Sequence, residues 1–217
     1  MSDIFNEVDE EVRREKLKRL WDRYQAFIIG GAILIVVLVG GWRLNQWWEA
    51  KQAAEAGGAF QTALTLSAEG KHAEAEAAFT KIAEKGAAGY RDIARLQAAG
   101  ELAQRDPKAA VEAYDALAAD PRLNDTMRDL AAVRAGLLLV DTASYEDLRR
   151  RLEPATAPDR PFRNSAREIL ALSALRANDA AAARKWFDQI VTDVAAPAGL
   201  RQRIEMLMAL APDTGNS

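Results

Sequence analysis

A repeat of 36 residues is the feature that most restricts how this chain can fold. An alanine recurs four times at this interval, and a small or aliphatic residue follows it each time. The four pairs are Ala63/Leu64, Ala99/Gly100, Ala135/Gly136 and Ala171/Leu172. Repeats of this length are typical of arrays in which no single unit can bury its apolar face, so that neighbouring units stack to form a continuous core. The spacing therefore predicts an array of four units.

A second pattern follows each alanine pair and defines the unit. A small or aliphatic residue is followed four positions later by a larger apolar one, and turn-forming residues separate the two patterns. The later pairs are Ala75/Phe79, Ala110/Tyr114, Leu148/Leu152 and Ala183/Phe187, and the turns are at Gly70-Lys71, Asp106-Pro107, Asp141-Thr142 and Asn178-Asp179. Each unit is thus predicted to be a helix, a turn and a second helix, in which the small residue lets the second helix approach closely. A non-repeating bundle of alanine-rich hairpins is the alternative.

Composition and the C-terminal residues support an all-α protein. Leu, Ala and charged residues dominate, with 28% of residues charged, and Gly199–Leu210 lies between two prolines as a terminal capping helix would. Cysteine is absent, which excludes disulfides and cysteine metal sites. The net charge of −3 is spread along the chain without a basic patch, so no nucleic-acid partner is expected.

An uncharged segment of 19 residues, Tyr24–Trp42, precedes the repeats. As a helix it would extend about 28 Å, close to the ~30 Å hydrocarbon thickness of a bilayer. A signal peptide has a shorter apolar core and a cleavage site soon after it. A buried core helix does not account for the aromatic residues at both ends, which are expected to anchor the helix at the membrane surfaces. These predicted anchors are Trp21, Tyr24, Trp42, Trp47 and Trp48.

Basic residues on either side of the span predict its orientation. Six precede it (Arg13, Arg14, Lys16, Lys18, Arg19 and Arg23), and two follow it within 20 residues (Arg43 and Lys51). Because Lys and Arg near a span are retained on the cytoplasmic side, the N-terminus is predicted to be cytoplasmic. The C-terminal domain is then translocated, which in a bacterium means a single-pass inner-membrane protein with a periplasmic domain.

These patterns divide the chain into five segments. Residues 1–23 form a cytoplasmic segment, either a short amphipathic helix or the frayed start of the membrane helix. Residues 24–42 form the transmembrane helix, and residues 43–57 a periplasmic juxtamembrane helix or linker. Residues 58–211 form the repeat domain, and residues 212–217 are predicted to be a disordered tail.

The sequence offers little for catalysis. It has one histidine, no glycine-rich phosphate loop and no histidine–carboxylate spacing for a metal. His72 follows the Gly70 turn, where a repeat places a packing residue. We therefore expect no enzyme, cofactor, metal or small-molecule substrate, and we expect the repeats to bind proteins.

The unit resembles the tetratricopeptide repeat, although most of the usual first-helix aromatics are missing. The wider layout resembles the YfgM-like family of membrane-anchored tetratricopeptide-like proteins. That resemblance rests on Gly41-Trp42-Arg43, Ala59-Phe60-Gln61-Thr62-Ala63, Glu69-Gly70-Lys71 and Tyr90–Ala99. It implies an ancillary subunit of the SecYEG translocon in a chaperone network, with a PpiD-like membrane chaperone and emerging chains as partners. The longer acidic-then-basic N-terminus departs from the family pattern.

By the same resemblance, the first helix of each unit lines a concave partner groove. The implied groove residues are Gln61, Thr65, Gln97, Glu101, Val133, Leu137, Ile169 and Ser173. Such a groove would change from polar to apolar along the array and could take an unfolded segment or an amphipathic helix. The alternative is that Val133, Leu137 and Ile169 belong to the core between repeats. Two other functions remain open, namely a tethered scaffold for cell-wall or division machinery and a cytoplasmic-facing adaptor of a signalling protein.

Overall fold

The computed structural model describes residues 3–210, and every regular element in that range is helical. The chain divides into two compact units, Met1–Ala54 and Glu55–Ser217. One long helix, α1 (Asp3–Ala68), runs through the first unit and supplies the first helix of the second. Residues 43–57 are therefore helical, and the predicted tail 212–217 lies outside the described residues.

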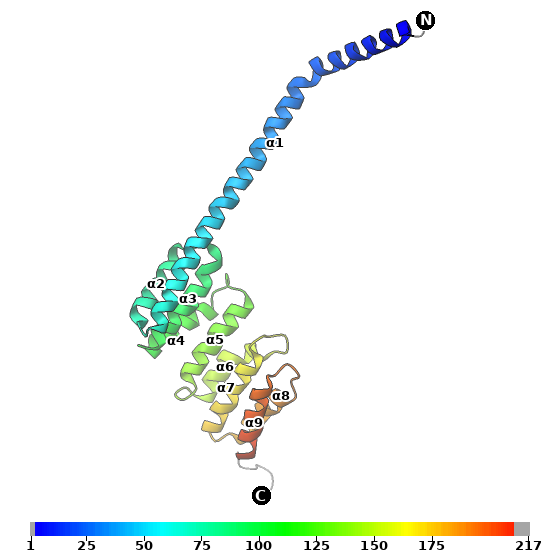
Figure 1. The fold of residues 1–217 in the computed structure, drawn as a ribbon. Helices are drawn as coiled ribbons and strands as arrows, with labels where there is room; N and C mark the ends of the chain where they lie inside the picture. The colour runs from blue at the N-terminus through cyan, green and yellow to red at the C-terminus, as the bar shows by residue number, and fades with distance from the viewer. Residues whose placement is uncertain (1–2, 211–217) are drawn as a thin grey trace. The chain divides into compact units, whose positions relative to one another are not determined.

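Up to residue 210, where the described part of the chain ends, the second unit contains four helical hairpins followed by one more helix (Figure 1). The end of α1 pairs with α2 (His72–Lys85) in the first hairpin. The others are α3 (Ala88–Ala103) with α4 (Pro107–Ala118), α5 (Asp125–Leu139) with α6 (Tyr145–Leu152), and α7 (Arg163–Arg176) with α8 (Ala180–Val191). A 3-10 turn, η1 (Glu153–Thr156), follows α6, and α9 (Ala198–Leu210) ends the array. The predicted all-α class, with several helical hairpins and a C-terminal helix, is confirmed.

The predicted turn residues end and begin helices in the structure. Gly70 has a φ of 74°, the left-handed conformation that lets the chain leave α1 without steric cost. Asp106 caps α4 by accepting hydrogen bonds from the amides of Lys108 and Ala109, with Pro107 at the first helical position. Asp179 caps α8 in the same way by accepting from the Ala182 amide. Local sequence thus fixes the hairpin boundaries.

Among the described residues of the second unit, three buried clusters form the core along the array. The first, between the end of α1, α2 and α3, contains Ala63, Ala75, Phe79, Ile82 and Ala94. The second, between α3, α4 and α5, contains Leu96, Ala99, Tyr114, Leu117, Leu123, Ala131 and Ala135. The third, which extends from α5 to α9, is the largest: Val133, Leu148, Leu152, Ala155, Ala166, Ile169, Leu170, Ala171, Ala174, Ala183, Trp186, Phe187, Ile190, Ala196 and Ile204.

Candidate protein-binding surface

The repeated alanines set the orientation of every first helix. Ala63, Ala99, Ala135 and Ala171 are all buried, each in the first helix of its hairpin. The residue after two of them is a glycine that the second helix approaches closely. A Cβ added at Gly136 would lie 2.8 Å from Leu152 Cδ1, and one added at Gly100 would lie 3.3 Å from Tyr114 Oη. The packing therefore requires a small residue at these two positions, as the sequence predicts, because the second helix approaches them closely.

The aromatic and aliphatic partners of these small residues are buried. Phe79, Leu152 and Phe187 are almost completely inaccessible, and Tyr114 is nearly so. Burial raises the pKa of the Tyr114 phenol, and the nearby Arg134 guanidinium partly offsets that increase. These side chains hold the two helices of each hairpin together and are unavailable to a partner.

Four of the predicted groove residues are at least partly accessible at the N-terminal end and middle of the array. Gln61 and Thr65 are exposed on α1, Gln97 is half-buried on α3, and Leu137 on α5 is 56% exposed although it is apolar. The Thr65 hydroxyl donates to the Gln61 carbonyl oxygen at 3.0 Å, so its hydrogen is already used within α1. This face offers uncharged polar groups and one apolar anchor.

Glu101, a fifth predicted groove residue, is half-buried and joins three helices. Its carboxylate accepts a hydrogen bond from the Ser67 hydroxyl at 2.5 Å and lies 2.8 Å from His72 Nδ1. Ser67 is at the end of α1, His72 begins α2, and Glu101 is on α3. The only histidine of the sequence therefore has a structural partner between the first and second repeats.

The other three predicted groove residues are buried and belong to the core. Val133 is 4% exposed, Ile169 is 1% exposed and Ser173 is inaccessible, with no hydrogen-bond partner for its hydroxyl. The cause is the stacking of this half of the array, because α5 contacts α7 and η1 packs against both. Val133, Ile169 and Ser173 are thus core residues rather than groove residues.

Sequence reasoning missed a set of ion pairs that tie a first helix to the loop after its second helix. In the second repeat, Arg95 of α3 donates to Asp120 at 2.8 Å, and Arg122 donates to the same carboxylate at 2.9 Å. The Arg122 and Arg95 guanidinium groups hold the pKa of Asp120 well below its usual range. We use the name helix-to-loop ion pairs for this contact and for its two counterparts in the third and fourth repeats.

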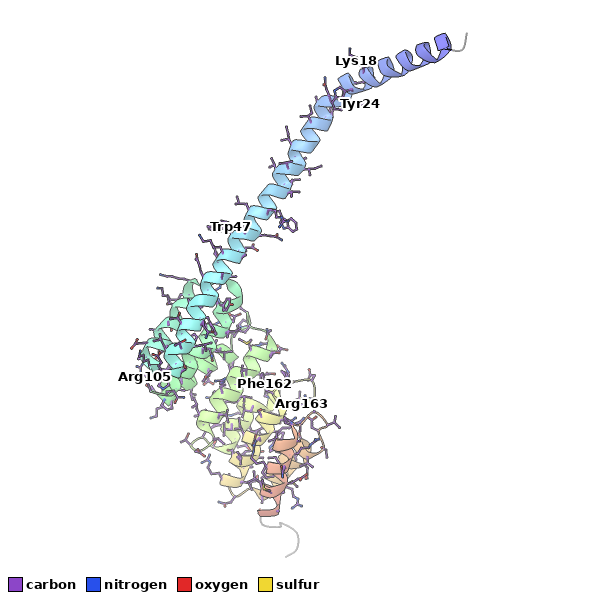
Figure 2. The ribbon with its side chains drawn as sticks, viewed as in Figure 1. Lys18, Tyr24, Trp47, Arg105, Phe162 and Arg163 are labelled. Carbon is purple, nitrogen blue, oxygen red and sulfur yellow. The ribbon has the colours of Figure 1, made fainter. Side chains whose placement is uncertain are left out.

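The fourth repeat contains the most extensive helix-to-loop ion pair. Asp193, after α8, accepts from Arg163 Nε at 2.5 Å, from Asn164 Nδ2 at 3.1 Å and from Arg167 Nη1 at 3.2 Å, and Figure 2 labels Arg163 at this site. Arg167 is buried and also donates to the Thr156 carbonyl oxygen at 2.8 Å. The Arg163 guanidinium is the main cause that holds the pKa of Asp193 far below its usual range.

In the third repeat the charges are exchanged. Here Arg160 belongs to the loop after α6, and its Nη1 lies 3.4 Å from Asp129 and 3.0 Å from Asp125, both on α5. Asp129 is buried, and this desolvation raises its pKa despite the nearby arginine. A signal was present in the sequence, since Arg95 and Arg167 lie two repeat lengths apart and an aspartate follows each of them 25 or 26 residues later.

The first unit carries the predicted membrane anchors. Trp21, Tyr24, Trp42, Trp47 and Trp48 are all exposed on α1, as are the large apolar residues described between them. Figure 2 labels Tyr24 and Trp47 on this helix. Within the described residues, α1 is the one helix long and apolar enough to cross a membrane, over a stretch that begins at Arg23. A helix with this much accessible apolar surface is compatible with a single-pass membrane anchor.

The described residues contain no group of three or more His, Asp or Glu side chains that could hold a metal ion. A protein-family model described as a tetratricopeptide repeat-like domain matches residues 18–209. No curated protein and no solved structure gives a significant match. Tetratricopeptide-type arrays are typically non-enzymatic scaffolds for protein partners, which agrees with the exposed face described above.

Proposed function

The chain belongs to the family of tetratricopeptide repeat-like domains, and from that premise we propose that it is a membrane-anchored scaffold that binds proteins at the Sec translocon. Its partners in this role are emerging chains and a membrane-anchored chaperone of the PpiD-like type. The chain itself catalyses no reaction. The repeat domain lies in the periplasm of a bacterium and the N-terminus lies in the cytoplasm.

One observation carries this proposal: a single α-helix, α1, contains both the apolar segment and the first helix of the repeat domain. The helix α1 contains the 19 uncharged residues and also Ala63, the small residue of the first repeat. The anchor therefore confines the partner-binding domain to the membrane surface, where a translocated chain first appears. The choice of the Sec translocon among membrane machines rests on the sequence resemblance.

Crosslinking from the span tests the choice of machine. A photoreactive amino acid at Ile33 or Val37 would occupy an exposed position on α1. We expect light-dependent products that contain a subunit of the Sec channel. Products with only cell-wall or division proteins would instead support the envelope-scaffold alternative.

A reporter fusion tests the orientation. A reporter that is active only in the periplasm, fused after Ser217, should be active, because six basic residues precede the span and two follow it. Activity of a cytoplasm-specific reporter at the same position would overturn the orientation and favour the adaptor of a signalling protein. A fusion with Arg43 and Lys51 kept and the six preceding basic residues replaced by Gln serves as the matched control, and it should lower the periplasmic signal.

The accessible predicted groove residues form the proposed partner-binding face. These are Gln61, Thr65, Gln97, Glu101 and Leu137. Their mixture of amide, hydroxyl and apolar groups suits a polypeptide segment whose backbone needs hydrogen-bond partners and whose apolar side chains need an anchor.

A further inference from the structure

We propose that the residues immediately after the span bind the phosphate of an anionic phospholipid. The site consists of Arg43, Trp47 and Lys51, which we call the cationic stripe. It rests on the proposed membrane anchoring and adds a specific lipid ligand to it.

The three residues share one face of α1. They are spaced four residues apart, and at about 100° per residue Trp47 and Lys51 lie roughly 40° and 80° around the helix from Arg43. The Lys51 ammonium is 5.6 Å from the centroid of the Trp47 ring, so the cation and the indole are already adjacent. Two cations and the indole N–H, each a hydrogen-bond donor, are thus presented on the same side of the helix.

Of the two acidic residues near the stripe, Glu49 points elsewhere, and Glu55, one turn beyond Lys51, forms no ion pair with it in the described part of the chain. Glu49 lies on the opposite side of α1, and its carboxylate accepts a hydrogen bond from Asn45 at 2.8 Å. Within the part of the chain that the structure describes, neither Arg43 nor Lys51 is paired with a carboxylate. The positive charge of the stripe is therefore available to an anion from outside the helix.

The depth of the stripe matches the phosphate layer of a bilayer. Trp47 lies five residues beyond Trp42, the end of the uncharged segment, which is about 7 Å along a helix. The headgroup layer adds roughly 5–7 Å to each side of the hydrocarbon core. Trp47 would then lie at the level of the phosphates. Lys51 is nine residues beyond Trp42, about 13 Å along the helix, and its ammonium reaches back to the Trp47 ring. The long side chain of Arg43 could extend from the hydrocarbon boundary to the same level.

The charge of the stripe selects the class of lipid. A zwitterionic headgroup brings its own cation next to Lys51 and Arg43, whereas an anionic headgroup brings only the phosphate charge. The rings of Trp47 and Trp48 are more than half exposed, which leaves them free to contact the glycerol and upper acyl chain. We therefore assign the site to an anionic glycerophospholipid.

Lipid retention tests the assignment. The full-length protein would be placed in nanodiscs of phosphatidylcholine alone or of phosphatidylcholine with phosphatidylglycerol, and lipids that remain bound after release would be counted by native mass spectrometry. We expect phosphatidylglycerol to be enriched over its share in the disc. The double variant Arg43→Gln/Lys51→Gln should reduce this enrichment by roughly fivefold for each cation removed. The matched control Lys81→Gln/Lys108→Gln removes two exposed cations from the repeat domain and should retain the enrichment.

Each other outcome has a distinct meaning. Equal enrichment in the wild type and the double variant would overturn the cationic stripe while leaving the anchor intact. Failure of the wild type to enter either kind of disc would contradict the anchor itself. Loss of the enrichment in excess inorganic phosphate would show that the site takes free phosphate rather than a lipid. If the wild type and Arg43→Gln/Lys51→Gln capture the same protein partners to the same extent, an acidic protein is excluded as the occupant.

Discussion

The two halves of the repeat array use the same positions differently. In the N-terminal half, the positions of Gln61 and Gln97 are polar and at least partly accessible, and the buried residues form two separate clusters. In the C-terminal half, the equivalent positions are Val133 and Ile169, and both lie inside one cluster that extends from α5 to α9. A single repeat register thus supplies an open face in one half and core in the other.

This difference indicates a division of labour along the array. A first-helix position can contact a partner only where neighbouring first helices leave it accessible. In the C-terminal half, a continuous core takes the place of this surface. The α6–α7 connection packs on α5 and α7 through η1 and is joined to α5 by the Arg160–Asp129 ion pair. The N-terminal half, next to the anchor in sequence, keeps its polar face. Binding is therefore expected in the N-terminal half and at Leu137, where the two halves meet.

Removing an aromatic residue from each half should give the largest contrast. Phe79→Ala and Phe187→Ala each delete an almost inaccessible ring from the second helix of a repeat, at a cost of about 3–5 kcal/mol. Because clusters in an array couple mainly to their neighbours, Phe187→Ala should raise amide hydrogen exchange throughout α5–α9. Phe79→Ala should raise it only from the end of α1 to α3. Exchange raised equally in α7–α9 by Phe79→Ala would contradict the separation of the two halves.

The sequence predicted the hairpins because their determinants are local or strictly periodic. The buried alanines, Gly100, Gly136 and the turns at Asp106-Pro107 and Asn178-Asp179 all appear in the structure where the pattern places them. For Val133, Leu137 and Ile169 the sequence left groove and core open, and the structure buries Val133 and Ile169 but exposes Leu137. The choice, like the burial of Ser173, depends on how tightly successive first helices stack. The resemblance implied a groove along the whole array, whereas the packing leaves Val133, Ile169 and Ser173 without access to a partner.

The helix-to-loop ion pairs were missed for a related reason. They join residues from different elements, and their charges are exchanged in the third repeat, where Arg160 in the loop contacts Asp129 on the helix. A search for one recurring charge at one position would therefore find Arg95 and Arg167 but fail at Ala131, which occupies the equivalent position in between. The loop length also differs between repeats, so the acidic partner does not keep a constant spacing.

The opposite pKa shifts of Asp193 and Asp129 predict opposite pH responses. The folded-state pKa of Asp193 lies below its ordinary value of 3.8, so its ion pair contributes stability above that pH and loses it as the pH falls further. Asp193→Asn should lower the free energy of unfolding by about 2 kcal/mol at pH 7 and flatten the acid dependence below pH 4. Urea unfolding at several pH values measures both effects.

Asp129→Asn is the matched comparison. The folded-state pKa of Asp129 is raised by burial, so the ionised carboxylate opposes folding at neutral pH and the protonated form does not. The variant should therefore be at least as stable as the wild type at pH 7, and its advantage should shrink as the pH falls through the raised pKa. A loss of stability at pH 7 as large as that of Asp193→Asn would show that the two ion pairs are equivalent.

The smallest change in stability, with the largest change in binding, is expected at the junction of the halves. Leu137→Asp alters a side chain that is 56% exposed, so the free energy of unfolding should change by less than about 1 kcal/mol. Val133→Asp, one helical turn away, places a charge at a site that is 4% exposed and should unfold the C-terminal half. Circular dichroism and partner crosslinking on the same samples separate the two effects. If Leu137 anchors a partner, Leu137→Asp keeps its helicity and loses the crosslink. If the variant keeps both its helicity and the crosslink, Leu137 is not part of the binding face, which is then confined to the residues of α1 and α3.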